Sequence, residues 1–167
     1  DEAERQALIQ RIAEICEHKL MDQVTAFQWW CRAISEAPTS EMAGEEVERL
    51  ARVVRTWEEL VQVYSDTLQG DIARRDAAVQ RLLFLKVARV FEFELRDLQR
   101  AEEAHLNVLK IDSKDAEALA ALDRIYAQLS MWPELADILA RRIQIMPETD
   151  DRIELYFRLG KVYTDAL

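Results

Sequence analysis

Apolar residues recur along this chain at the three- and four-residue spacing that is typical of amphipathic α-helices. Near its start, Leu8, Ile12 and Ile15 fall on one stripe of such a helix. Comparable stripes continue to the end of the chain. The pattern predicts nine helices, over residues 4–20, 23–37, 41–55, 57–69, 75–95, 98–111, 115–130, 132–146 and 150–166.

Single residues mark where these helices begin and end. Pro38, Gly70 and Pro147 interrupt the helical pattern. Asp22 and Asp97 stand just before apolar stripes, where a short carboxylate can accept a hydrogen bond from a free backbone N–H, so we expect both to be N-caps. The short connections make consecutive helices antiparallel neighbours.

The sequence also repeats itself at an offset of 75 residues. A further unit begins near the end, where residues 157–163 match residues 85–91 at an offset of 72. The offsets predict one solenoid over residues 1–167, made of units 1–75, 76–149 and the beginning of a third at 150–167. Identical pairs at the first offset include Leu8 and Leu83, Ala13 and Ala88, Leu20 and Leu95, Ala26 and Ala101, Arg49 and Arg124, Trp57 and Trp132, and Leu60 and Leu135.

Composition narrows the class of protein. Only three residues of 167 are Gly and three are Pro, too few for the turns of an all-β fold or for a phosphate-binding Gly-rich loop. No apolar run approaches the roughly 20 residues that a bilayer requires, so no membrane insertion is expected. The net charge of −10 argues against binding to nucleic acid. The chain begins at Asp1 without a signal-peptide pattern, and we expect a cytoplasmic piece of a longer protein.

A set of small, aromatic and apolar residues recurs at characteristic places in the helical hairpins: Leu122, Tyr126, Trp132, Leu135, Leu139 and Pro147, and Leu159, Gly160 and Tyr163 of the last helix. With these residues the sequence resembles the tetratricopeptide repeat family, in which helical hairpins stack into a right-handed α-solenoid. Two departures are Asp123, where the family prefers Gly, and Cys16, where it prefers an aromatic residue. The resemblance implies that the first helices of the hairpins line a concave, peptide-binding groove and that the second helices form the convex face.

Family geometry projects one first-helix residue per hairpin into this groove. Four successive residues of this kind are basic, namely Arg49, Arg89, Arg124 and Lys161, and apolar candidates on the same face are Leu85, Phe93 and Phe157. Such a groove would suit an acidic or amphipathic peptide, because arginine makes strong charge-assisted hydrogen bonds to carboxylates. The alternative is that these cations pair with nearby carboxylates on a solvated helix face, as the spacing of Glu45 with Arg49 and of Arg89 with Glu92 allows. The asparagines of the family's carboxylate clamp are absent.

The remaining chemistry-bearing residues have structural interpretations. His105 replaces a packing residue, and neither it nor His18 has metal-ligand spacing around it. Cys16 and Cys31 are expected to be free thiols. Trp29 is either an inter-repeat packing residue or an exposed contact on the convex side. No nucleophile has an evident base, so we expect neither catalysis nor a metal or cofactor.

The sequence therefore predicts a non-catalytic, all-α interaction scaffold, part of a larger bacterial protein, with an acidic protein or peptide as partner. The bacterial assignment rests on a resemblance to long arrays whose second helices open with Trp-Glu-Glu-Leu or Trp-Pro-Glu-Leu. One alternative is a structural spacer or assembly module that self-associates through the solenoid ends or the convex face. A second alternative is the regulatory repeat region of a multidomain enzyme or sensor.

Overall fold

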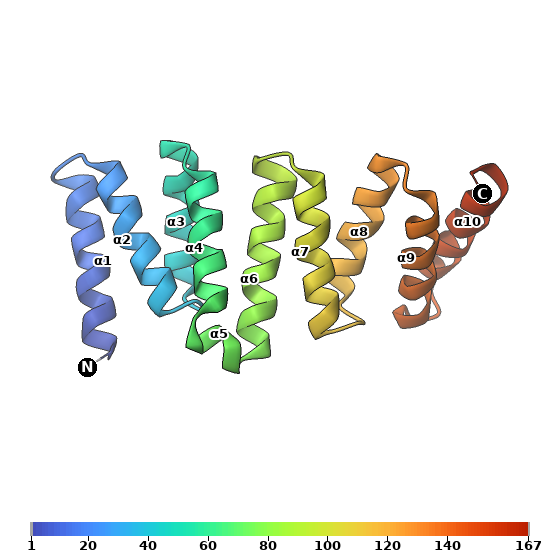
Figure 1. Cartoon of the computed structure of the whole chain (residues 1–167), viewed down its shortest axis with the longest axis horizontal. Helices are drawn as coiled ribbons and strands as arrows, with labels where there is room; N and C mark the ends of the chain where they lie inside the picture. The colour runs from blue at the N-terminus through green and yellow to red at the C-terminus, as the bar shows by residue number, and fades with distance from the viewer. Residues whose placement is uncertain (1, 167) are drawn as a thin grey trace. The chain divides into compact units, whose positions relative to one another are not determined.

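The computed structural model describes residues 2–166, and nearly all of them are helical (Figure 1). The described residues contain no strand, which confirms the all-α prediction. They form two compact units, residues 1–96 and 97–167. Unit 1 contains α1 (Glu2–His18), α2 (Gln23–Glu36), α3 (Glu41–Val54), α4 (Trp57–Gln69), α5 (Asp71–Arg75), α6 (Ala77–Arg89) and the π-helical segment η1 (Val90–Glu94). Unit 2 contains α7 (Leu98–Ile111), α8 (Ala116–Leu129), α9 (Trp132–Ile145) and α10 (Asp150–Asp165).

Each unit has its own apolar core, built from helices that are consecutive in the chain. In unit 1, α2 packs on α1, α3 and α4, and α4 packs on α5, α6 and η1. In unit 2, α8 packs on α7 and α9, and α9 packs on α10. The helices bury their apolar stripes against each other, which is the main source of helix stability in water. Large side chains that are completely buried include Phe27, Ile34, Leu50, Leu60 and Tyr64 in unit 1, and Val108, Leu119, Leu122, Ile125 and Leu139 in unit 2.

The turn from a first helix to a second helix has a recurring backbone geometry. Among residues 2–166, four non-glycine residues have positive φ, and each stands directly before the N-cap of a second helix: Met21, Arg55, Arg96 and Ser130. Met21 and Arg96 are 75 residues apart, as are Arg55 and Ser130, so the backbone repeats at the offset found in the sequence. Left-handed backbone lets the chain reverse within a few residues but is strained for any side chain with a Cβ.

Carboxylate and hydroxyl caps fix where helices begin. The Asp22 and Asp97 side chains accept from Thr25 N and Arg100 N, both at 3.0 Å, which confirms both predicted caps. Ser40, Asp76 and Asp115 cap α3, α6 and α8 in the same way, although the helical pattern did not single them out.

The predicted helix over 75–95 differs most from the structure. Gly70 ends α4, and the five-residue α5 precedes α6, because Asp76 caps a new start by accepting from Ala78 N and Val79 N. The helix then changes to π geometry, and Leu95 N donates to Val90 O across the wider turn. A π-turn inserts one residue and so shifts the side chains that follow it relative to a regular helix.

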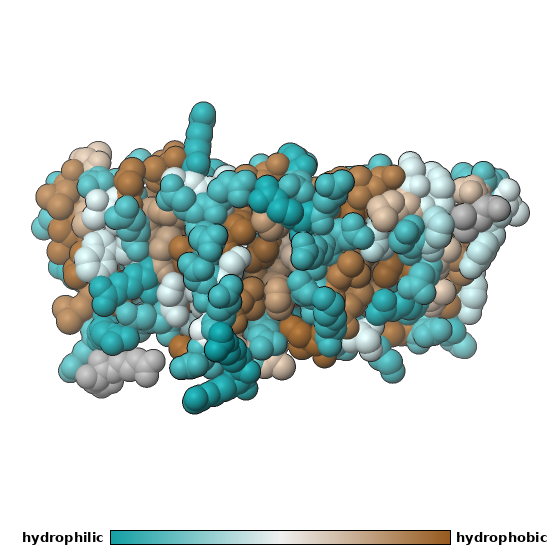
Figure 2. Space-filling view, viewed as in Figure 1, coloured by the Kyte–Doolittle hydropathy of each residue, from teal (hydrophilic) through white to brown (hydrophobic). Residues whose placement is uncertain are grey.

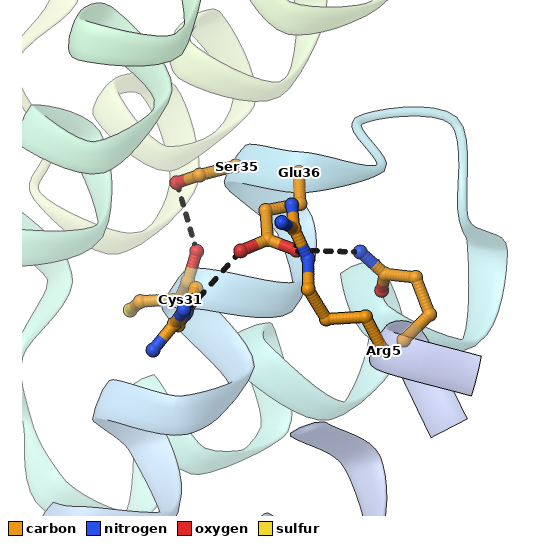
Figure 3. Close-up of polar contacts among 6 residues, drawn as sticks. Arg5, Cys31, Ser35 and Glu36 are labelled. Carbon is orange, nitrogen blue, oxygen red and sulfur yellow. Dashed lines mark hydrogen bonds and ion pairs between the residues drawn. The ribbon is translucent and has the colours of Figure 1, made fainter. Parts of the chain in front are cut away.

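A polar cluster ties α1 to α2. Glu36 accepts hydrogen bonds from Arg5 Nε at 2.9 Å, Arg32 Nε at 3.2 Å and Gln6 Nε2 at 3.3 Å. Figure 3 shows Arg5 and Glu36 within this cluster. Burial acts to raise the pKa of Glu36, but the hydrogen bonds from Arg32 and Arg5 outweigh it and lower that pKa. Nearby, Ser35 Oγ donates to Cys31 O at 2.9 Å, within one helical turn. The hydrogen bonds to Glu36 from Arg5 and Gln6 hold α1 and α2 of the first hairpin together.

Candidate functional site

Unit 1 contains a narrow polar cleft between α3, the start of α4, and the end of α6 with η1. We name it the Trp57 cleft, and its volume is about 110 Å³. It brings together two of the predicted groove residues, Arg89 and Phe93. Its lining consists of Glu48, Arg52, Trp57, Lys86, Arg89, Val90, Phe93 and Glu94.

The inner wall of the Trp57 cleft is an ion pair with an aromatic support. Lys86 Nζ donates to Glu48 Oε1 at 2.7 Å and lies 5.8 Å from the centre of the Tyr64 ring. The Tyr64 hydroxyl also donates to Glu48 Oε1, at 3.3 Å. Burial, followed by the charge of Glu48, raises the pKa of Tyr64. These contacts fix the Lys86 ammonium in place, because a cation in a partly buried site is stabilised by a carboxylate and an aromatic face.

The rim of the Trp57 cleft is more exposed. Arg52 Nη2 donates to Glu94 Oε1 at 3.1 Å, and its guanidinium lies 5.8 Å from the Trp57 ring centre. Phe93 is 49% exposed. For Arg89, no hydrogen bond or ion pair is described among residues 2–166, although its charge acts on the Tyr64 hydroxyl. Arg89 is therefore the cation of this cleft that is available to an anionic ligand.

Unit 2 contains a wider cleft between α10 and the α8–α9 hairpin. We name it the Trp132 cleft, and its volume is about 620 Å³. The largest apolar side chains come from α9, and the charged ones come from α10. Its lining consists of Ala127, Trp132, Leu135, Leu139, Arg158, Lys161, Val162, Asp165 and Ala166.

The inner wall of the Trp132 cleft is also an ion pair, and here three helices contribute. Arg158 donates from Nη1 to Asp123 Oδ2 at 2.8 Å and from Nη2 to Asp123 Oδ1 at 2.5 Å. Arg142 of α9 also donates to Asp123 Oδ2. The Asp123 side chain is only 3% exposed, and its hydrogen bonds raise the pKa of Arg158. Two guanidinium groups on one carboxylate leave this cluster with a net positive charge.

The two clefts are repeats of one another. At the offset of 75, Glu48 matches Asp123 and Trp57 matches Trp132. At the offset of 72, residues 86, 89 and 90 match residues 158, 161 and 162. Each unit thus has a tryptophan that opens a second helix, a carboxylate–cation pair beside it, and a further cation one turn along, Arg89 or Lys161. For the Lys161 ammonium, as for the Arg89 guanidinium, no partner is described in residues 2–166.

The structure places the other predicted groove residues differently. Arg49 Nη2 donates at 2.7 Å to both Glu17 of α1 and Glu46 of α3, so it bridges two helices rather than pairing with Glu45. Arg124 Nη1 donates to Ala120 O at 3.3 Å, within its own helix.

The apolar predictions divide between buried and exposed positions. Leu85 is only 7% exposed, so its assignment as a surface contact was wrong: its side chain belongs to the core. Phe157 is 71% exposed on α10 and stays available. Trp29 is half-buried, with the Arg32 guanidinium 5.5 Å from its ring centre. Its role on the convex side stays a prediction.

The sequence interpretation missed the partners that hold each cleft together. Glu48, Lys86, Asp123 and Arg158 were not recognised as ion pairs, although Glu48 and Asp123 stand at the offset of 75 that relates Trp57 to Trp132, and Lys86 and Arg158 stand at the offset of 72. A position-by-position comparison of the repeats would have matched the Glu48–Lys86 pair with the Asp123–Arg158 pair. Asp123 was noted only as a departure from the family pattern.

The histidines, cysteines and carboxylates of residues 2–166 do not form a metal-binding group. These residues contain no group of three or more His, Cys, Asp and Glu side chains placed to hold a metal ion. Cys16 and Cys31 are buried free thiols, and burial, followed by the charge of Glu59, raises the pKa of Cys31 to about 12. A thiol held in its protonated form is a poor nucleophile. His105 is buried, as predicted. No described helix has the length and apolar character needed to cross a membrane.

Solved structures resemble this fold over nearly the whole chain. A MamA RS-1 ArsTM double mutant superposes with a TM-score of 0.56 at 14% sequence identity, over 96% of this chain and 85% of that one. A tetratricopeptide repeat protein from Parabacteroides merdae ATCC 43184 superposes with a TM-score of 0.57 at 15% identity, over 95% of this chain and 60% of that one. No family model and no curated protein matches the sequence. The fold is therefore a tetratricopeptide-like helical repeat, as the resemblance predicted.

Proposed function

We propose that this chain is a non-catalytic protein-interaction scaffold that binds an acidic, partly apolar peptide segment. The observation that supports this most directly is the repeated cleft, in which an available cation lies beside a tryptophan. Arg89 holds that position next to Trp57 and Phe93, and Lys161 holds it next to Trp132. Carboxylates of a peptide would pair with these cations while its apolar side chains contact the aromatic rings.

The negative net charge of the chain means that an acidic peptide must be bound through short-range contacts. A chain with a net charge of −10 repels acidic peptides at long range, so binding depends on contacts within a few ångströms of the two clefts. The partly buried pairs Lys86–Glu48 and Arg158–Asp123 hold the clefts in shape without using Arg89 or Lys161. Such preorganisation lowers the entropy that binding must otherwise overcome.

The proposal is tested by selecting binders from a random-sequence peptide display library against the whole chain. We expect the selected peptides to be enriched in Asp and Glu next to large apolar residues. A variant with Arg89→Glu and Lys161→Glu should bind them at least about tenfold more weakly, the loss expected for charge-assisted hydrogen bonds.

The matched control carries Arg75→Glu and Lys110→Glu, which make the same charge change at exposed positions outside both clefts. Circular dichroism should show the same helix content for all three proteins. Enrichment in basic peptides, or equal loss of binding in the cleft variant and the control, would contradict the proposal.

A second candidate function is self-assembly, which the exposed apolar residues at the two ends of the chain favour. Leu8 of α1 is 62% exposed, Leu20 and Met21 after the end of α1 are also exposed, and so are Ile153 and Phe157 of α10. In the face seen in Figure 2, apolar surface appears over α1 among polar side chains. Sedimentation velocity over a range of concentrations distinguishes the two functions. Growth in mass that Leu8→Glu or Phe157→Glu abolishes would support assembly, and a concentration-independent monomer would exclude it.

The setting of the protein is also part of the proposal. A bacterial cytoplasmic scaffold remains the expectation. Fractionation of cells that express the native gene, followed by detection with an antibody raised against this chain, checks the compartment. Recovery in the membrane or extracellular fraction would contradict it.

A further inference from the structure

The two clefts differ in volume and in some of the side chains that line them. In the Trp57 cleft, Phe93, Glu94 and Arg52 line the space, and the volume is about 110 Å³. At the matched positions of the Trp132 cleft stand Asp165, Ala166 and Ala127, and the volume is about 620 Å³. Unit 1 thus carries an aromatic residue followed directly by a glutamate where unit 2 has shorter side chains.

We infer that the Trp132 cleft binds an aromatic residue followed by an acidic residue in a partner peptide, in the place that Phe93 and Glu94 occupy in the Trp57 cleft. This inference rests on the proposed function, and it names the sequence that one of the two clefts selects. In unit 1 the protein's own Phe93 and Glu94 line the matching cleft, with Phe93 49% exposed and Glu94 paired with Arg52.

The walls of the Trp132 cleft suit an aromatic ring. Trp132, Leu135 and Leu139 of α9 supply an apolar surface, and Val162 of α10 faces it. A volume of about 620 Å³ lies within the range of small-ligand pockets, roughly 300–1,000 Å³, and accommodates one large side chain with its backbone. Burying an aromatic side chain in this space removes apolar area from water, and an edge-to-face contact with Trp132 adds to that gain.

Val162 of α10 is less covered than its counterparts in earlier helices. It is half-buried, whereas Leu50, Val90 and Ile125 at the matched positions are buried. Because Val90 is also a valine, the difference lies in how much surrounds Val162 rather than in the size of its side chain.

The charges of the Trp132 cleft favour one carboxylate rather than several. Arg158 is held by Asp123, and Arg142 binds the same carboxylate, so the wall is cationic but its hydrogen bonds are in use. The Lys161 ammonium is the group at the rim that can accept a carboxylate as a partner. Asp165 lies one helical turn beyond Lys161 and repels further negative charge. A single acidic residue next to the aromatic residue therefore fits better than an acidic run.

The inference is tested with three blocked dipeptides: acetyl-Phe-Glu-amide, acetyl-Phe-Gln-amide and acetyl-Ala-Glu-amide. Each is titrated into the ¹⁵N-labelled chain at millimolar concentration, and the backbone amide shifts are followed. We expect the Phe-Glu probe to shift amides of the first turns of α9 and the last turns of α10. Its affinity should exceed that of the Phe-Gln probe about two- to fivefold, the range expected for one exposed ion pair.

Two variants test the aromatic and the acidic part of the inference separately. Asp165→Phe places an aromatic ring in the cleft, as Phe93 does in unit 1, and should abolish the shifts. Because Asp165 is exposed, this change leaves the core of unit 2 intact. Lys161→Gln should reduce the affinity for the Phe-Glu probe to that for the Phe-Gln probe, whereas Lys110→Gln should leave both unchanged.

The outcomes separate this inference from the proposed function. Equal shifts from all three probes, or shifts that persist in Asp165→Phe, would overturn the inference. If display-selected acidic peptides bind the whole chain, lose binding in Arg89→Glu and keep it in Asp165→Phe, the proposed function stands and this inference fails. If the Phe-Glu probe binds as expected but no acidic peptide is selected by the whole chain, the proposed function fails instead.

Discussion

Arg158 of α10 donates hydrogen bonds to both carboxylate oxygens of Asp123 of α8, at 2.8 and 2.5 Å. The preceding repeat has the Lys86–Glu48 pair at the matched positions. Asp123 occupies the site where tetratricopeptide repeats prefer glycine. The side chain there reaches Arg142 and Arg158 on two neighbouring helices. An ion cluster therefore joins α8, α9 and α10 and forms the inner wall of the Trp132 cleft.

Removal of Asp123 should destabilise unit 2. Asp123→Ala leaves Arg142 and Arg158 without their shared carboxylate, and Arg142 is the more buried of the two. We expect a loss of about 3 kcal/mol in the free energy of unfolding, at the low end for broken buried pairs because Arg158 is partly exposed. Amide hydrogen exchange in α8–α10 measures the effect. Asp137→Ala is the control, since its contact with Arg141 is long, at 3.9 Å, and exposed. Unchanged exchange in Asp123→Ala would show that the cluster contributes nothing.

Glycine at a left-handed turn should stabilise the protein. Ser130 has φ of 57° and ends α8, so its Cβ is strained in a way that glycine avoids. After allowance for the greater chain entropy of glycine, Ser130→Gly should raise the free energy of unfolding by about 0.5–1 kcal/mol. Urea unfolding followed by circular dichroism checks this. Ser113→Gly, at a turn residue without positive φ, should be neutral or destabilising, and a similar gain in both variants would rule out backbone strain as the cause.

The buried tyrosines should make the fold sensitive to alkali. Burial raises the pKa of Tyr64, helped by Glu48, and burial raises that of Tyr126, helped by its hydrogen bond to Glu102. Above the ordinary tyrosine pKa of 10.0, the unfolded chain ionises at these positions while the folded chain does not, so stability present at neutral pH is lost as the pH rises. The Tyr64 contribution should fall by up to about 1.4 kcal/mol per pH unit.

Urea unfolding between neutral pH and pH values above 10 measures this loss. Tyr64→Phe should flatten the alkaline part of the stability curve, although it leaves Glu48 without one donor. A curve that is equally steep in the variant would show that Tyr64 ionises in the folded protein.

Arg49 should act in structure rather than in binding. Its guanidinium bridges Glu17 and Glu46, so Arg49→Gln should lower the free energy of unfolding by about 0.5–1 kcal/mol. Arg11→Gln serves as the control, because its contact with Glu14 is 3.9 Å long and more exposed. Affinity for a display-selected peptide should be the same in the wild type and in Arg49→Gln. A tenfold loss of affinity in Arg49→Gln would contradict this prediction and show that Arg49 contributes to peptide binding.

Much of the fold follows from the sequence because the determining signals are local or periodic. The helical stripes, the caps at Asp22 and Asp97 and the breaks at Pro38 and Gly70 depend on neighbouring residues only. The π-turn at Val90–Glu94 and the short α5 do not follow from that pattern, because an apolar helical pattern tolerates either geometry. The break between α5 and α6 has a local cause that the pattern did not single out, the Asp76 cap on the start of α6.

The candidate site was harder to predict because it depends on how side chains pair. The repeat position predicted the same role for Arg49 and Arg89. In the structure, Arg49 bridges Glu17 and Glu46, whereas no ion pair is described for Arg89 among residues 2–166. Leu85 was assigned to the surface from the same periodic reasoning, yet it is buried. The paired residues of the two clefts lie 38 and 35 positions apart in the sequence, on different helices. Spacing within a single helix therefore does not reveal them.

The most direct test of the account is the affinity of a display-selected acidic peptide for the wild type and for Arg89→Glu, measured by fluorescence anisotropy. The account predicts at least about tenfold weaker binding in the variant, and partial recovery when one acidic residue of the peptide is changed to lysine. Arg75→Glu should bind like the wild type. Equal affinity for the wild type and Arg89→Glu, with no gain from the lysine-substituted peptide, would contradict recognition of an acidic segment by the Trp57 cleft.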